Sequence, residues 1–108
     1  MAQPGASHES RDEELVRRIV TEALRGRPVR IFLFGSRARG DASVTSDFDV
    51  AILPDEPLSR DVLSRIRESL EESCLPVTVD LVDLTDAPAA LRAQVLEEGR
   101  EWIVSRRA

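Results

Sequence analysis

The sequence predicts an α/β fold in which a small mixed sheet is flanked by helices. Patterns typical of helices and of strands alternate along the chain, and its 108 residues suit one domain. Three apolar runs have the length of strands, and three longer segments repeat apolar residues at helical spacing. Hydrophobic residues make up 42% of the chain, which is enough for one modest core.

The first predicted helix covers residues 10–25. Ser10 and Glu13 have the spacing of a capping box, and Pro28 follows the helix as a stop signal. The next segment, Val29–Phe34, is almost wholly apolar. Such a run is typical of a strand that is covered on both faces, so we predict the first strand here.

A polar turn over residues 35–45 follows, with a short helix starting near Ser36. The second strand is predicted over Asp47–Leu53, before a turn that is rich in acidic residues and proline. A second long helix then precedes Pro76, because four apolar residues recur at every fourth position. They are Leu58, Val62, Ile66 and Leu70.

The third strand is predicted over Val77–Leu84. Asp86 and Pro88 are expected to open the last helix. Its apolar stripe is predicted to comprise Leu91, Val95, Leu96, Trp102 and Ile103. In this interpretation one domain covers residues 10–104, residues 1–9 form a disordered tail, and residues 105–108 form a frayed tail.

Composition excludes several classes of function. The net charge of −5 argues against nucleic-acid binding as the main role. The chain contains no lysine, which excludes a phosphate-binding loop of the Gly-x-x-x-x-Gly-Lys type. A single cysteine excludes an intramolecular disulfide and a multi-cysteine zinc site. There is neither an 18-residue apolar run nor the apolar core of a secretion signal, so we expect a cytoplasmic protein without a membrane span.

Two segments at the ends of neighbouring strands carry the candidate chemistry. Gly35 and Ser36 follow the first strand, where backbone N–H groups and a hydroxyl can hold phosphate. Asp47 and Asp49 begin the second strand, and alternate residues of a strand share a face. Two adjacent carboxylates favour a cation, and carboxylates combined with phosphate oxygens suit Mg²⁺. These features predict a nucleoside-triphosphate site with metal.

Each of these residues also has a simpler interpretation. Aspartates are common where a strand starts beside a loop, and Ser36 could serve only as a turn or helix cap. Arg37 and Arg39 could both reach phosphate oxygens, and Arg37 is the preferred contact because it lies nearer the turn. Ser46, before the carboxylate pair, could orient Asp47 or brace the loop.

The third predicted strand adds two more carboxylates, Asp80 and Asp83. Burying a carboxylate in such an apolar strand is costly without a partner. The two residues are three positions apart and therefore point to opposite faces, so only one of them can face Asp47 and Asp49. A solvated sheet edge is the alternative environment for Asp80.

The long motif resembles a known family. Gly35-Ser36, then Arg37-Ala38-Arg39-Gly40, then Ser46-Asp47-x-Asp49 is similar to the signature of the minimal nucleotidyltransferases (MNT) of the DNA polymerase beta superfamily. The resemblance covers roughly residues 10–104 and implies the compact nucleotidyltransferase fold. It places Asp80 as the third catalytic carboxylate beside Asp47 and Asp49. These three would hold Mg²⁺, as two ions, and nucleotide would be bound by Gly35, Ser36, Arg37 and Ser46.

The resemblance also implies a function. Proteins of this kind are often antitoxins that use ATP to transfer AMP to a tyrosine of a partner toxin of the HEPN type. Two other functions stay open: a non-catalytic antitoxin that only masks its partner, and one part of a small-molecule nucleotidyltransferase of the aminoglycoside kind. The expected partners are therefore ATP and a HEPN toxin, without membrane or direct nucleic-acid contact, and a homo-oligomer stays open.

Overall fold

The computed structural model describes residues 11–40 and 47–103. In chain order the elements are α2 (Arg11–Ala23), β1 (Val29–Phe34), α3 (Ser36–Arg39), β2 (Phe48–Pro54), α4 (Arg60–Glu71), β3 (Val79–Asp83), α5 (Ala89–Glu98) and β4 (Arg100–Trp102). Ser10, Ser46 and both predicted tails lie outside the described residues. Within the described ranges, no helix has the length and apolar character needed to cross a membrane.

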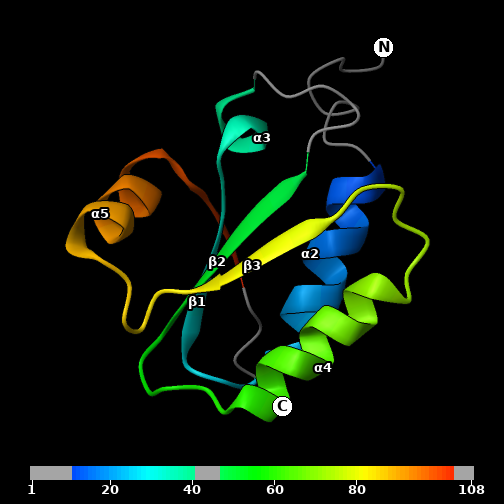
Figure 1. Cartoon of the computed structure of the whole chain (residues 1–108), viewed down its shortest axis with the longest axis horizontal. Coiled ribbons are helices and arrows are strands. Elements are labelled where there is room, and N and C mark those ends of the chain that lie inside the picture. The colour runs from blue at the N-terminus through cyan, green and yellow to red at the C-terminus, as the bar shows by residue number, and fades with distance from the viewer. Residues whose placement is uncertain (1–10, 41–46, 104–108) are drawn as a thin grey trace.

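The four strands form one mixed sheet in the order β3-β2-β1-β4. β1 runs antiparallel to both β2 and β4, whereas β2 and β3 run parallel. Helices α2 and α4 lie on one face of the sheet and α5 lies on the other (Figure 1). This architecture confirms the predicted α/β fold with a mixed sheet between helices.

The sheet faces two hydrophobic clusters of different size. The larger cluster joins α2 and α4 to the sheet, and its members include Val16, Val20, Ile31, Leu33, Phe48, Val50, Ile66 and Leu70. The smaller cluster joins α5 to the opposite face through Phe32, Ala51, Leu84 and Val95. Successive residues of β2 alternate between the two clusters, as the side-chain period of a strand requires.

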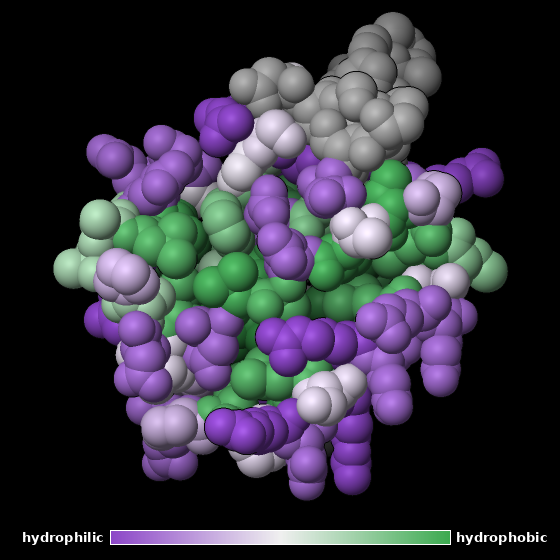
Figure 2. Space-filling model, viewed as in Figure 1, coloured by the Kyte–Doolittle hydropathy of each residue, from purple (hydrophilic) through white to green (hydrophobic). Residues whose placement is uncertain are grey.

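Helix α4 follows the predicted four-residue spacing. Ile66 and Leu70 are buried against the sheet, and the Ser59 hydroxyl caps the helix by accepting a hydrogen bond from the Val62 N–H at 3.3 Å. Leu58 precedes the helix but still packs on the larger cluster. Figure 2 shows hydrophilic side chains over much of the rim of the viewed face. Apolar side chains gather towards its centre.

The predicted course of the last helix is wrong at its end. Helix α5 ends at Glu98, and Arg100–Trp102 forms β4, which pairs with β1 at Ile31–Leu33. Trp102 is therefore a core residue with 5% exposure, while Ile103 is 81% exposed. The helix ends because Gly99 adopts an extended conformation, and the open edge of β1 offers new backbone hydrogen bonds to the residues that follow.

Candidate functional site

The site begins where β1 ends at Phe34. Gly35 has a φ of +77°, which is readily adopted only by glycine, and it turns the chain away from the sheet. Its carbonyl oxygen accepts hydrogen bonds at 3.1 Å from the N–H groups of Ala38 and of Arg39. This single turn is α3, which confirms the short helix predicted near Ser36.

Strand β2 brings Asp49 against this turn. Asp49 is paired in register with Phe34, the residue before Gly35. A Cβ atom at Gly35 would overlap the Asp49 carboxylate, so only a residue without a side chain permits this approach. The turn and the carboxylate strand, which are separate in the sequence, therefore meet at Gly35 and Asp49.

Strand β3 places Asp80 directly beside Asp49. The two residues are partners in the parallel β2–β3 register and therefore share one face of the sheet. Asp47 lies two residues before Asp49 and is exposed. Asp80 is also exposed, because β3 is an edge strand, so it is both near the other aspartates and in contact with solvent.

Asp83 has a different environment. Its Oδ1 accepts hydrogen bonds from the Thr85 N–H at 2.9 Å and from the Thr85 hydroxyl at 2.6 Å. These contacts stabilise the turn after β3. The structure therefore gives Asp83 a local role, and Asp80 is the carboxylate of β3 that lies beside Asp49.

Electrostatics couple the three aspartates. Partial burial raises the pKa of Asp49 above its usual value, and the negative charges of Asp80 and Asp47 raise it further. The positive charge of Arg39 acts in the opposite direction. Carboxylates that repel one another in this way are stabilised by a cation.

The carboxylate oxygens of Asp47, Asp49 and Asp80 are suitable ligands for Mg²⁺, but they do not form a closed site. Within residues 11–40 and 47–103, no three acidic, histidine or cysteine side chains lie close enough together to hold a metal ion by themselves. Mg²⁺ is usually bound by one or two carboxylates together with substrate phosphates and water, so a closed protein cage is not required. The donor set of Asp47, Asp49 and Asp80 therefore fits a metal that arrives with a nucleotide.

The two arginines of α3 lie in different environments. Arg37 places its Cζ 3.9 Å from the centre of the Phe48 ring. Arg39 acts on Asp49 electrostatically, and its Nη1 lies 3.9 Å from Oε1 of Glu98. Residues two apart on a helix do not face the same way, which is consistent with the different contacts of Arg37 and Arg39. This spacing indicates that the two arginines have different partners, but only the structure shows that Arg39 acts on Asp49.

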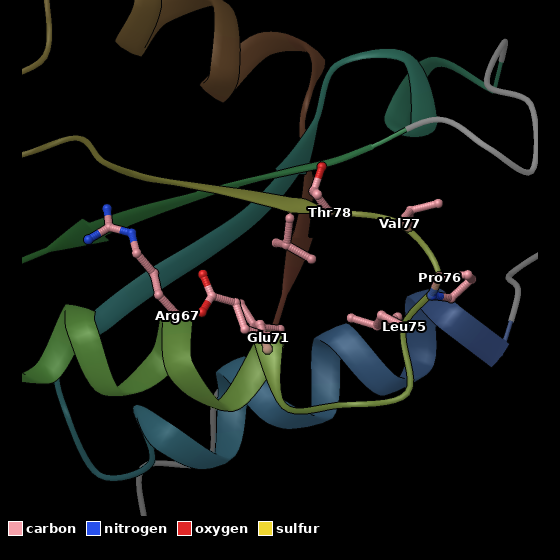
Figure 3. A pocket seen from close by; sticks show the side chains of 8 residues that line it. Arg67, Glu71, Leu75, Pro76, Val77 and Thr78 are labelled. Carbon is pink, nitrogen blue, oxygen red and sulfur yellow. The ribbon is translucent and has the colours of Figure 1, made fainter.

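A separate cavity of about 330 Å³ opens between the end of α4 and β3. Figure 3 shows the side chains around it, which come from α4, the following loop and the first residues of β3. They are Arg67, Leu70, Glu71, Leu75, Pro76, Val77, Thr78 and Val79. None of the predicted site residues that the structure describes lines this cavity, so Asp47, Asp49 and Asp80 lie outside it.

Comparisons with known proteins identify relatives of this arrangement. The family model described as "Polymerase beta, Nucleotidyltransferase" matches residues 18–107. A probable protein adenylyltransferase, MntA of Haemophilus influenzae, is 45% identical over 53 residues, which are 49% of this chain and 46% of the relative. The protein adenylyltransferase MntA of Shewanella oneidensis is 37% identical over 71 residues, 66% of this chain and 50% of the relative. The chain thus spans about half the length of these curated relatives.

Solved structures show the same fold. A toxin–antitoxin crystal structure with AMP-PNP contains a chain that is 26% identical with a TM-score of 0.68, covering 91% of this chain and 77% of that one. A second similar chain belongs to a complex of tri-AMPylated Shewanella oneidensis HEPN toxin with MNT antitoxin. It is 26% identical with a TM-score of 0.62, covering 89% of this chain and 72% of the other.

Proposed function

The chain belongs to the polymerase beta nucleotidyltransferase family, and on this premise we propose that it transfers AMP from ATP to a hydroxyl group of a partner protein. One observation carries the proposal. Asp49 lies beside Asp80 in register and directly against Gly35, so that a turn suited to phosphate meets carboxylates suited to a metal. The similar chain from the complex with AMP-PNP supports ATP as the nucleotide.

The proposed reaction follows from this arrangement. Gly35 and Ser36 hold the phosphates, with Ser46 and an arginine of α3 as further contacts. Asp47, Asp49 and Asp80 would hold Mg²⁺, as two ions, which supplies neutralising charge to the triphosphate when bound. The acceptor oxygen attacks the α-phosphorus, the bond to the β-phosphate oxygen breaks, and pyrophosphate leaves. Asp80 is exposed at the sheet edge, where it can take the proton of the incoming hydroxyl.

The acceptor is proposed to be a tyrosine of a HEPN toxin, which makes this protein an antitoxin of the cytoplasm. Support comes from the relatives named protein adenylyltransferase and from the tri-AMPylated HEPN toxin bound to a similar chain. Exposure of Asp80 also favours an acceptor that approaches from outside the chain.

The test is transfer of label from α-labelled ATP, with Mg²⁺, to the purified product of the gene next to the one that encodes this chain. Asp49→Asn keeps the shape of the side chain and removes its charge. We expect it to lower the rate of labelling at least about 100-fold, because the negative charge that would hold Mg²⁺ is lost. Asp83→Asn is the matched control, since its Oδ1 can still accept the hydrogen bonds from Thr85.

The outcomes separate catalysis from masking. Label on the partner with wild type and Asp83→Asn, but not with Asp49→Asn, would support transfer. No label with any variant, while the two proteins still form a tight inactive complex, would contradict transfer and support an antitoxin that acts by masking. Label on a small molecule instead of the protein would identify the aminoglycoside-type alternative.

A further inference from the structure

We propose that Arg37 is a positioning residue that holds the carboxylate strand β2 against the turn of Gly35 and Ser36 through the ring of Phe48. This inference rests on the proposed function, because it concerns the same nucleotide site. It assigns Arg37 a role different from the phosphate contact predicted from the sequence.

The contact between Arg37 and Phe48 is close. The Arg37 Cζ lies 3.9 Å from the ring centre, so the planar guanidinium stacks on the ring face, an arrangement that a lysine ammonium cannot reproduce. Phe48 is fully buried, with 0% exposure, so its ring cannot move without disturbing the larger hydrophobic cluster. A planar guanidinium on such a ring is therefore held in a defined place.

Phe48 lies between the two aspartates in the sequence. Its side chain points into the cluster under α2 and α4, whereas Asp49 shares its face of β2 with Ala51, which packs against α5. The ring on which Arg37 stacks therefore lies on the face of β2 opposite to the Asp49 carboxylate. Arg39 is the cation that acts on Asp49, which is consistent with this separation.

This geometry gives Arg37 an indirect effect on the site. Helix α3 has only four residues, and Gly35 touches Asp49 at its start. The stacking of Arg37 on Phe48 adds a second contact between the same turn and the same strand. Together the contact of Gly35 with Asp49 and the contact of Arg37 with Phe48 set the position of the phosphate-binding turn relative to Asp47 and Asp49. A small displacement of these groups would weaken nucleotide binding.

Two substitutions of Arg37 give opposite expectations for the two roles. Arg37→Phe keeps a flat group over Phe48 without charge, and Arg37→Lys keeps the charge without a flat group. If Arg37 acts by positioning through planar stacking, Arg37→Phe should retain the wild-type Kd for Mg·ATP within about threefold. Arg37→Lys keeps a cation but loses the planar group, and it should raise the Kd about tenfold. Isothermal titration calorimetry of the full chain measures both values.

A double-mutant cycle with Phe48→Leu provides the independent readout. In metal-free protein, urea unfolding of wild type, Arg37→Lys, Phe48→Leu and the double variant should show coupling, with the cost of Arg37→Lys largely lost once the ring is absent. The same non-additivity is expected in the Kd for Mg·ATP.

Several results would overturn this inference. Loss of binding in Arg37→Phe with near-normal binding in Arg37→Lys would show a direct phosphate contact. Additive effects in the cycle, or a lower Tm for Arg37→Lys with an unchanged Kd, would show that Phe48 does not transmit a positioning effect. Failure of the wild type to bind Mg·ATP would overturn the proposed function and this inference with it.

Discussion

Gly35 and Gly40 flank α3 and both have a positive φ angle, but their ψ angles of −157° and 10° differ, so only Gly40 lies in the left-handed helical region. Their φ angles are +77° and +85°. They differ in what surrounds them, because a Cβ at Gly35 would overlap the Asp49 carboxylate, whereas a Cβ at Gly40 would meet no atom within 4 Å. At the residue scale, Gly35 is therefore required both by its backbone conformation and by the close approach of the Asp49 carboxylate.

Gly35→Ala should reduce AMP transfer at least about 100-fold, because the added methyl group displaces the Asp49 carboxylate from the turn. Gly40→Ala is its matched control. Gly40→Ala should lose about 1–2 kcal/mol of unfolding free energy because of its left-handed conformation. Gly35→Ala should lose more, because its φ and ψ lie in a region open essentially to glycine alone and the methyl group overlaps Asp49. Urea denaturation would measure both losses. Equal transfer rates for the two variants would show that the close approach of Gly35 to Asp49 is not needed.

At the scale of elements, β4 is a three-residue strand held to its neighbours by charged pairs. Arg30 of β1 donates two hydrogen bonds to the Glu101 carboxylate, at 3.1 and 3.0 Å. Arg100 lies 3.2 Å from the buried carboxylate of Glu13 in α2. Trp102 fills the core beside these pairs. Side-chain contacts on both sides thus compensate for the short backbone pairing of β4 with β1.

The Arg30–Glu101 pair predicts a pH dependence. Its hydrogen bonds lower the pKa of Glu101 below the ordinary value of 4.5. The stabilisation is therefore complete above that value and is lost as the pH falls through the lowered pKa. Because both side chains are partly exposed, Glu101→Gln should cost no more than about 1 kcal/mol at pH 7.

Urea unfolding of wild type and Glu101→Gln between pH 7 and pH 2 tests this prediction. The difference between the two proteins should shrink towards zero as the pH falls below 4.5. Glu97 is an exposed residue of α5, and Glu97→Gln serves as the control for the loss of one negative charge at the surface. A difference that grows at low pH would contradict the sign of the linkage.

At the scale of the whole molecule, one sheet separates two clusters that are otherwise independent. Ile66 on α4 belongs to the larger cluster, with 1% exposure. Leu84, after β3, belongs to the smaller cluster, with 0% exposure. The strands supply side chains to both clusters, so loss of either cluster removes support from the same sheet. We therefore expect the described domain to unfold as one unit.

Ile66→Ala and Leu84→Ala test this expectation from opposite faces. Each should lower the unfolding free energy by about 2–5 kcal/mol, since each leaves a cavity in a closely packed core. In both variants, Trp102 fluorescence and far-ultraviolet circular dichroism should report a single common midpoint. Separate midpoints in Leu84→Ala would show that the α5 face melts independently.

The sequence by itself determined the features that depend on neighbouring residues. The period of apolar residues predicted the long helices and the three strands, and the motif from Gly35 to Asp49 indicated the family. Alternation along the third strand also showed that only one of Asp80 and Asp83 could lie with the other aspartates. These inferences succeed because helical and strand spacing is a local property of the chain.

Tertiary structure decided the features that depend on distant partners. Trp102 fits the end of a helical stripe equally well, and only pairing with β1, about 70 residues earlier, makes it part of a strand. Likewise, the register of β3 beside β2 places Asp80 next to Asp49, and the orientation of α3 brings Arg37 onto the Phe48 ring and the charge of Arg39 near Asp49. The physical reason is that strand pairing and helix orientation are set by packing between segments, which local spacing does not encode.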